Sequence, residues 1–324
     1  MNNKTNNDAA IIEAIHDAGN RTVPGGLLIC EDLMEGCRKA LAEPDPLPLY
    51  KELWFTNEVC VFFASTNLGK SVLAMQILMG LSEKGYRVML ADFEMSWKQV
   101  QIRLTENGVL HEVEGCFKRV HVNPQAYNFD TFEEDVFEAF REIAIKERIQ
   151  VLAVDNLPKI CSDSEKPYAA GRFMQKLWTL RDELKISILV IAHTPKKFDF
   201  SPLTINDLAG SARISQFCDS AFALGKSTQG VDMRYLIQLK SRSGAFIYPA
   251  SNVLSLRLTK EGGWLHFEEE GTCRETDHIN RMDEDYQDNL RQQCQELSDG
   301  GKSYREIAKE LGINLTKVYR LLKK

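Results

Sequence analysis

The 324-residue sequence predicts an α/β fold with a mainly parallel central sheet and a small all-α unit at its C-terminal end. Two observations predict this fold class. Between residues 59 and 192, short apolar runs suited to buried strands alternate with segments of helical periodicity. After residue 284, only short amphipathic helical segments follow. Apolar residues make up 44% and charged residues 27%, which excludes a disordered or fibrous chain.

The expected elements follow in a regular order. The apolar runs predict strands at residues 59–64, 87–93, 151–154 and 186–192. The helical periodicity predicts helices at residues 71–84, 132–144 and 172–184. Further strands are expected at residues 221–224, 235–239, 253–258 and 264–267. The domain boundaries that we expect are an N-terminal extension at 1–50, a core domain at 51–267, an acidic linker at 268–283 and a C-terminal domain at 284–324.

Charge is unevenly distributed along the chain. Residues 301–324 carry seven Lys and Arg against two Glu, a formal charge of +5, whereas the whole chain has −6. A basic terminal unit on an acidic body is typical of a nucleic-acid-binding module, although a solvated Lys-rich helix gives the same pattern. The apolar runs are too short to span a membrane, the first residues lack the apolar core of a secretory signal, and the eight cysteines form no Cys-x-x-Cys pair. We therefore expect a soluble, cytoplasmic protein without a membrane partner.

A phosphate-binding loop follows the first expected strand. Residues 64–71 read Ala-Ser-Thr-Asn-Leu-Gly-Lys-Ser and open the next helix, with Ala64 where such a loop usually has Gly. Backbone N–H groups would bind nucleotide phosphates, Lys70 would reach the β- and γ-phosphates, and the Ser71 hydroxyl would hold Mg²⁺. The alternative is a chance Gly-Lys-Ser at a helix start. The expected nucleotide-binding residues are Ala64, Ser65, Thr66, Asn67, Leu68, Gly69, Lys70 and Ser71.

Two other expected strands end in carboxylates. Asp155 ends the strand at 151–154, at the sheet edge where α/β folds bind their ligands, and is a candidate for binding Mg²⁺. A strand-terminal Asp is otherwise a common turn former. Glu94 follows the strand at 87–93 and could act as general base toward a water attacking the γ-phosphate. Its structural alternative is to cap the helix that starts at Ser96, while Asp92 is expected to lie deeper.

Motifs in a fixed order resemble the RecA-like hexameric ATPases of the DnaB and plasmid RepA helicase type, within the AAA family ATPases. The motifs besides the phosphate loop are Phe-Glu-Met-Ser at 93–96, Asp155, Ile-Ala-His-Thr at 191–194, Asp-Leu-Ala-Gly-Ser-Ala at 207–212 and Lys-Ser-Arg-Ser-Gly at 240–244. The resemblance covers residues 50–260. It implies a RecA-like P-loop NTPase core that uses ATP and Mg²⁺, and a homo-oligomer, with a hexamer favoured.

The resemblance also implies catalytic roles. By it, Glu94 is the catalytic base, Lys70 binds the phosphates, and His193 senses the γ-phosphate. Lys240 and Arg242 contact the nucleotide held by a neighbouring subunit; a guanidinium suits the charge of a transferring phosphoryl group. From the residues alone, His193 would be a structural histidine, and the two alternating cations would mark a solvated strand edge.

The expected DNA contacts fall in two places. By the resemblance, loops after the strand at 186–192 face single-stranded DNA in a central channel, through Lys196, Lys197, Gly210, Ser211 and Arg213. These loops could equally be ordinary mobile surface loops. In the C-terminal unit, Ser303 and Glu306 form a capping box, and the segment resembles the helix-turn-helix of resolvases and small regulators. The candidate duplex-DNA contacts there are Thr316, Lys317, Arg320 and Lys323. A helical protein–protein module is the alternative.

These features together predict a DNA-dependent ATPase, an oligomeric RepA/DnaB-like helicase or DNA-remodelling motor of a mobile element or plasmid. The alternative is an ATP-controlled DNA-binding regulator of transcription or transposition without helicase activity. A third hypothesis is a non-hydrolysing DNA-binding scaffold, which Ala64 and the absence of an acid after Asp155 leave open.

Overall fold

The structure is a computed structural model that describes residues 28–160, 167–194, 200–208, 211–311, 313 and 315–322. The chain divides into two units, residues 1–45 and 46–324. In the first unit, helix α2 (Leu33–Ala40) begins at Asp32, whose side chain accepts a hydrogen bond from the Glu35 N–H at 2.9 Å. None of the α2 side chains is buried.

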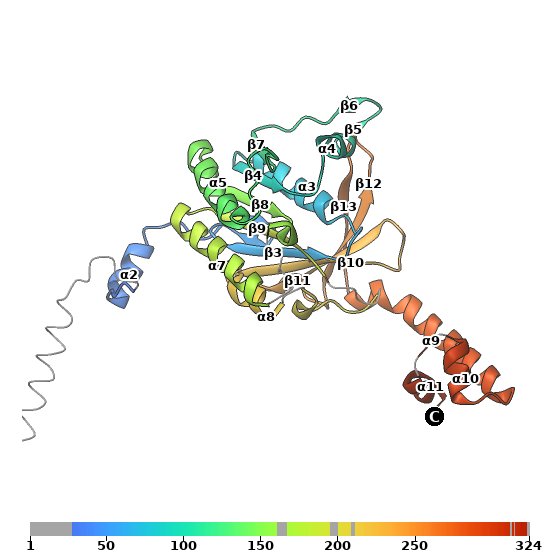
Figure 1. Cartoon of the computed structure of the whole chain (residues 1–324). Coiled ribbons are helices and arrows are strands. Elements are labelled where there is room, and N and C mark those ends of the chain that lie inside the picture. The colour runs from blue at the N-terminus through green and yellow to red at the C-terminus, as the bar shows by residue number, and fades with distance from the viewer. Residues whose placement is uncertain are drawn as a thin grey trace, which may run out of the picture. The chain divides into compact units, whose positions relative to one another are not determined.

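The centre of the second unit is a nine-stranded sheet within the described residues, in the order β13-β12-β11-β10-β3-β9-β8-β4-β7 (Figure 1). Strands β10 to β7 of this order pair in parallel, whereas β10 to β13 pair antiparallel. The mainly parallel sheet that the sequence predicts is therefore confirmed. The strands are β3 (Val59–Ala64), β4 (Arg87–Asp92), β7 (Cys116–Val120), β8 (Val151–Asp155), β9 (Ser187–His193), β10 (Ser220–Lys226), β11 (Met233–Lys240), β12 (Val253–Thr259) and β13 (His266–Cys273).

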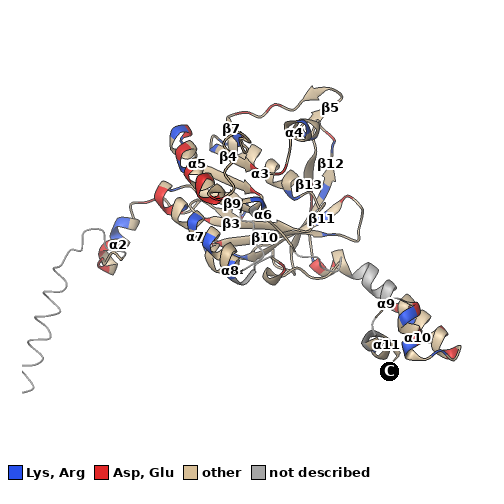
Figure 2. Cartoon of the chain, in the orientation of Figure 1, with Lys and Arg blue, Asp and Glu red and all other residues tan. Residues whose placement is uncertain are grey.

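Helices and two small hairpins connect these strands. The helices between the sheet strands are α3 (Lys70–Glu83), α4 (Trp97–Arg103), α5 (Phe132–Glu147), α6 (Leu157–Ile160), α7 (Pro167–Leu184), the 3-10 helix η1 (Ile205–Asp207) and α8 (Ser211–Phe217). The hairpins are β1 (Pro48–Tyr50) with β2 (Trp54–Phe55), and β5 (Thr105–Glu106) with β6 (Val109–Leu110). Charged residues lie mainly on helices such as α5 and α7, and the central strands of the sheet are nearly free of them (Figure 2).

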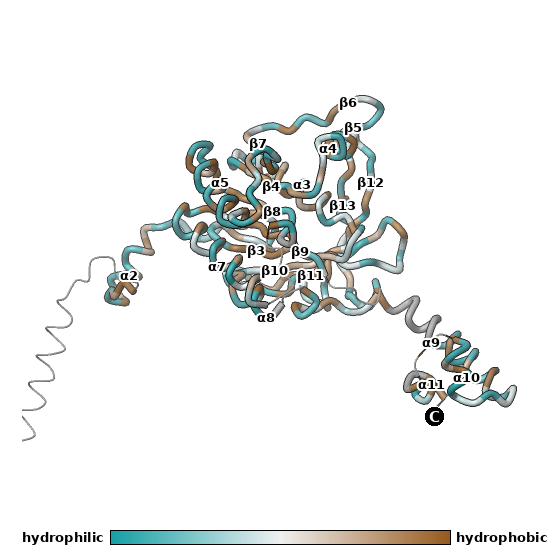
Figure 3. The backbone as a smooth tube through the Cα atoms, viewed as in Figure 1, coloured by the Kyte–Doolittle hydropathy of each residue, from teal (hydrophilic) through white to brown (hydrophobic). Residues whose placement is uncertain are grey.

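The sheet is buried on both faces, which explains its continuous apolar runs. In β3, Phe63 joins a core with side chains of α5 and α7, and Phe62 joins the opposite core, built on α3. Both rings are fully buried, and burial of each contributes about 1.5–3 kcal/mol. The hydropathy colouring shows the same apolar centre (Figure 3). This packing fixes the carboxyl end of β3, from which the phosphate loop leaves.

The acidic segment 268–283, expected as a linker, differs in the structure. It forms most of strand β13 and the first turns of helix α9 (Glu275–Asp299). Its acidic side chains lie on an exposed sheet edge, where Glu270 Oε1 pairs with Arg257 Nε at 2.5 Å, while Phe267 is buried. Composition indicated a linker because the solvated side of an edge strand has the residue content of a linker.

A separate small core holds the C-terminal helices. Helix α9, α10 (Tyr304–Glu310) and α11 (Leu315–Leu322) bury Leu290, Cys294, Ile307, Val318 and Leu321. The predicted capping box is confirmed, because Glu306 accepts a hydrogen bond from the Ser303 N–H at 2.9 Å. No helix among the described residues combines the length and the apolar character that a bilayer crossing requires.

Candidate nucleotide-binding site

The phosphate loop joins β3 to α3 and is held in shape by its neighbours. Gly69 precedes the helix with φ of 95°, and a Cβ at this position would lie 2.8 Å from the Phe267 ring. Arg234 Nε of β11 donates to the Leu68 carbonyl at 3.2 Å. The loop therefore ends at the N-terminus of a 14-residue helix, where free backbone N–H groups and the helix dipole favour an anion.

Lys70, Ser71 and Asp155 form the polar centre of the site. Burial lowers the pKa of the Lys70 ammonium, against the opposing charges of Asp155 and Glu94. Burial raises the pKa of Asp155 to about 6, although Lys70 and a hydrogen bond from Ser71 act in the opposite direction. Oδ1 of Asp155 is buried without a hydrogen-bond partner among the described residues. An unpartnered carboxylate oxygen beside a hydroxyl fits Mg²⁺, which prefers oxygen ligands.

Glu94 lies on a turn that Asp92 holds in place. Asp92 Oδ1 accepts hydrogen bonds from the N–H groups of Glu94 at 3.0 Å and Met95 at 2.9 Å. Its Oδ2 accepts from Arg119 Nε at 3.0 Å, so Asp92 is occupied and fully buried. The Glu94 side chain is 34% exposed. Glu94 does not cap α4, because the helix begins at Ser96, which forms its own capping box.

His193 lies at the end of β9, beside the phosphate loop and the two carboxylate-bearing strands. Its register partner on β3 is Ala64, and Asp155 pairs with Ile191 of the same strand. The His193 Nε2 lies 3.0 Å from Asn156 Nδ2 and 3.9 Å from Glu94 Oε1. Burial, and then the Lys70 charge, lowers the pKa of His193, which favours a neutral ring. Parallel strands thus bring all four predicted groups, Lys70, Glu94, Asp155 and His193, to one sheet edge.

Sequence reasoning missed two residues of this site. Arg103, at the end of α4, has a buried Nη1 without a hydrogen-bond partner among the described residues, and its charge contributes to the lowered pKa of Lys70. Asn156 drew attention only as the place of a missing acid, yet it contacts His193. A cation one short helix after Glu94 was the available signal for Arg103. The sequence held no comparable signal for Asn156.

Lys240 and Arg242 are not brought to this site. Lys240 pairs with Ala221 of β10, which in turn pairs with Val61 of β3. Lys240 Nζ donates to the carbonyls of Ser215, within α8, and Cys218, just after it, both at 2.6 Å. Arg242 Nη1 pairs with Asp219 Oδ1 at 3.1 Å.

The Asp219 carboxylate places Arg242 at the amino end of β3. Its Oδ2 accepts a hydrogen bond from the Val59 N–H at 2.9 Å. The phosphate loop leaves the other end of the same strand, roughly 16 Å away for six residues of extended chain. An arginine side chain cannot bridge that distance within one subunit.

The structure describes few of the predicted DNA contacts. Arg213 is exposed on α8, and Arg320 is exposed on α11. Lys196, Lys197, Gly210 and Lys323 lie outside the described residues, and Ser211, Thr316 and Lys317 are described only by their backbone in α8 and α11. These assignments stay predictions.

The buried strand, the loop, the helix with Lys70 and Ser71 at its start, and the carboxylate at a neighbouring strand end define a P-loop nucleotide-binding protein. The family model described as AAA domain matches residues 33–199, and the chain belongs to this family. Among solved structures, the chain is similar to the ATPase domain of a DnaB-like helicase, with 13% identity and a TM-score of 0.55, over 74% of this chain and 99% of that chain. A search of the curated proteins finds no match. These findings confirm the RecA-like core and support an ATP hydrolase.

Proposed function

We propose that the chain is a DNA-dependent ATPase that hydrolyses ATP to ADP and phosphate. The loop N–H groups and Lys70 bind the phosphates, and Glu94 accepts the proton of the attacking water. Ser71 and Asp155 would hold Mg²⁺, which supplies charge neutralisation at the phosphate oxygens. His193 reports whether the γ-phosphate is present. The convergence of these side chains at one sheet edge is the observation that carries this proposal.

Hydrolysis requires a second subunit in this proposal. Arg242 lies at the opposite end of β3 from the phosphate loop of its own chain, so its guanidinium serves a nucleotide bound by a neighbour. A homo-oligomer, with a hexamer favoured, follows from this role, and Lys240 is proposed to act beside Arg242. Arg242→Ala is expected to bind ATP with unchanged affinity and to lose hydrolysis. Full turnover by this variant would contradict the action between subunits.

DNA is proposed to bind at two places, as single strands along the loops around α8 and as duplex at the C-terminal helices. The exposed cations Arg213 and Arg320 and the +5 charge of residues 301–324 support this. This arrangement suits a RepA/DnaB-like helicase or DNA-remodelling motor of a plasmid or mobile element in the cytoplasm.

The test is ATP turnover of the full chain without DNA, with single-stranded DNA and with duplex DNA. Arg213→Glu is expected to reduce stimulation by single strands, and Arg320→Glu to reduce binding of duplex. Lys70→Ala serves as the inactive reference, and Lys118→Glu, an exposed cation on the edge strand β7, is the matched charge control. Turnover that DNA does not change would contradict DNA dependence.

The alternative function, an ATP-controlled DNA-binding regulator, is supported by the C-terminal helices with their own buried core. Such a core suits a module that binds a DNA site irrespective of motor activity. Strand separation discriminates the two functions. Unwinding of a tailed duplex in the presence of ATP identifies the helicase, whereas nucleotide-dependent duplex binding without unwinding identifies the regulator.

A further inference from the structure

A tight turn, which we call the finger turn (residues 240–244), carries Arg242. The Ser241 hydroxyl closes it, accepting a hydrogen bond from the Gly244 N–H at 3.2 Å and donating one to the Gly244 carbonyl at 2.9 Å. A Cβ on Gly244 would lie 2.3 Å from Phe55 Cζ, so this position requires glycine. The turn is therefore packed directly against the hairpin that precedes β3.

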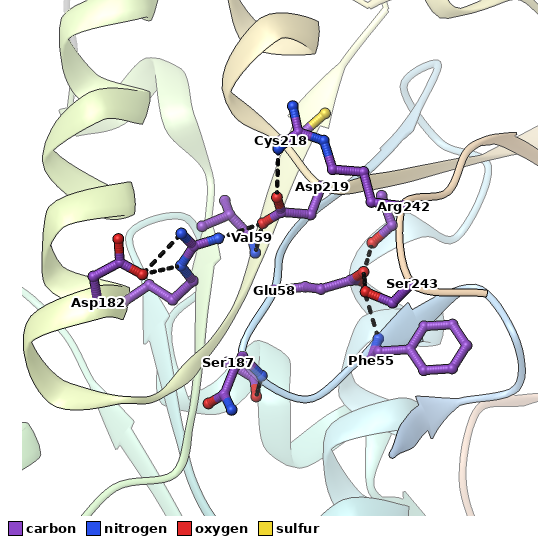
Figure 4. Close-up of polar contacts among 12 residues, drawn as sticks. Phe55, Glu58, Val59, Asp182, Ser187, Cys218, Asp219, Arg242 and Ser243 are labelled. Atoms are coloured by element: carbon purple, nitrogen blue, oxygen red, sulfur yellow. Dashed lines mark hydrogen bonds and ion pairs between the residues drawn. The ribbon is translucent and has the colours of Figure 1, made fainter. Parts of the chain in front are cut away.

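Two buried carboxylates hold the finger turn from the sheet side (Figure 4). Glu58 Oε1 accepts a hydrogen bond from the Ser243 hydroxyl at 2.6 Å, and its Oε2 accepts from Ser220 at 2.7 Å and from the Phe55 N–H at 3.2 Å. Glu58 is only 3% exposed. Its charge is thus satisfied by three donors, one of which belongs to the residue next to Arg242.

The second carboxylate, Asp219, is shared by two arginines. Oδ2 accepts hydrogen bonds from the Val59 N–H at 2.9 Å and from Arg181 Nη1 at 2.6 Å, while Oδ1 pairs with Arg242 Nη1 at 3.1 Å. Two cations surround one anion, so a positive charge remains. Arg181 is almost buried, whereas the Arg242 side chain is 56% exposed, so the exposed part of this charge belongs to Arg242.

This geometry leaves most of the Arg242 guanidinium available. Only Nη1 is engaged among the described residues, so the other nitrogens of the planar fork remain for a second ligand. A guanidinium fixed along one side by a carboxylate presents its other side in a defined orientation, which suits recognition of phosphate oxygens. A side chain oriented in advance loses little freedom when it meets its target.

We propose that Glu58 and Asp219 are positioning residues for hydrolysis between subunits, which orient Arg242 toward the phosphates bound by a neighbouring subunit. Asp219 fixes the guanidinium, and Glu58 fixes the adjoining Ser243. This inference rests on the proposed function, in particular on the action of Arg242 across the subunit boundary. Neither carboxylate touches the nucleotide of its own chain, because both lie at the amino end of β3.

The test mixes subunits with complementary defects. Glu94→Gln removes the base and keeps the finger turn, whereas Asp219→Asn keeps the base and releases Arg242. Each variant alone is expected to lose hydrolysis on the order of 10²-fold, and an equal mixture is expected to recover a clear fraction of the wild-type rate. Recovery occurs because the intact base of an Asp219→Asn subunit can adjoin the intact finger turn of a Glu94→Gln subunit. Arg242→Ala mixed with Glu94→Gln is the reference pair for action between subunits.

A milder variant keeps the inference testable if Asp219→Asn does not fold, which thermal unfolding and ATP binding will show. Ser243→Ala removes the contact with Glu58 and is expected to lower kcat about fivefold with unchanged KM and melting temperature. The loss is again expected to be recovered with Glu94→Gln. Ser251→Ala, an exposed serine outside the finger turn, is the matched control and is expected to have wild-type activity.

The outcomes separate the two levels of the argument. If the Arg242→Ala reference pair recovers activity but neither Asp219→Asn nor Ser243→Ala does, or if both variants have wild-type kcat, the positioning role is overturned and action between subunits stands. If the reference pair itself does not recover, action between subunits fails, and the positioning role fails with it. Recovery in all pairs supports both.

Discussion

Asn156 and His193 share a contact of 3.0 Å between the amide nitrogen of one and Nε2 of the other. Because an amide nitrogen only donates, Nε2 accepts, and the proton of the neutral ring lies on Nδ1. Asn156 directly follows Asp155, the candidate metal ligand, and is 2% exposed. One strand end therefore supplies both a ligand for the cation and the residue that orients the histidine.

Asn156→Ala is expected to release His193 while leaving Lys70 and Ser71 intact. Loss of one hydrogen bond of this kind corresponds to about fivefold in kcat, with KM for ATP nearly unchanged. Steady-state ATP hydrolysis with and without single-stranded DNA measures the effect, and stimulation by DNA is expected to fall further than the basal rate. Unchanged kcat and unchanged stimulation would show that the contact has no role.

Arg103→Met is expected to reduce kcat/KM for ATP by about tenfold to hundredfold, because a buried guanidinium near Lys70 is placed to meet phosphate charge. Arg103→Lys is expected to lose less, since the positive charge remains. Lys98→Met, an exposed lysine on the same helix α4, is the control with expected wild-type kinetics. Equal kinetics of Arg103→Met and this control would remove Arg103 from the site.

Gly69→Ala is expected to destabilise the chain and weaken ATP binding. Gly69 and Gly85 both have φ above 90°, so alanine strains the backbone at either position by about 1–2 kcal/mol. At Gly69 the added methyl group also meets the buried Phe267 ring, whereas at Gly85 it meets nothing within 4 Å. Chemical unfolding and titration with a fluorescent ATP analogue should show the larger loss of stability, and the only loss of affinity, in Gly69→Ala.

His278 gives the fold a specific dependence on pH. Its Nδ1 lies 2.8 Å from Ser227 Oγ, its Nε2 lies 3.0 Å from Ser255 Oγ, and its ring stacks on Tyr235. Burial lowers its pKa, although the nearby Asp277 charge acts to raise it. Below about pH 6.5 the unfolded chain binds a proton at His278 that the folded chain does not, so the free energy of unfolding falls as pH falls.

His278→Asn removes this proton uptake and is the variant that tests it. The stability advantage of the native chain over the variant is expected to be largest at pH 7.5 and to shrink toward pH 5.5, by at most about 1.4 kcal/mol per pH unit. Urea unfolding at several pH values measures the difference. Parallel stability curves for the two proteins would contradict the assignment.

The sequence predicted the parts of the fold whose residue pattern is set by burial. Strand β3 is buried on both faces and reads as a continuous apolar run, and the glycine and lysine after it mark the loop. Strand β7 was not predicted, because its residues 116–120 lie half exposed at a sheet edge and include two cations. The short helix α4 was missed for a similar reason, since Val100 is its only buried residue.

The site was predictable only in part. Lys70, Ser71, Asp155 and Glu94 follow strands or open a helix, which is a local signal. Arg103 depends on the fold of an unpredicted helix. The contacts of Lys240 with the end of α8 and of Arg242 with Asp219 join segments more than 20 residues apart, and no local pattern records them.

Strand β13 ends the sheet with three exposed glutamates at 268–270, and its pairing with β12 shifts register between Ser255 and Leu256. Negative side chains along an edge and a bulge within it both oppose backbone pairing with another strand. Two copies of the chain therefore cannot merge their sheets across this edge. Assembly has to use side-chain surfaces of other elements, which leaves each subunit able to shift against its neighbour without breaking a shared sheet.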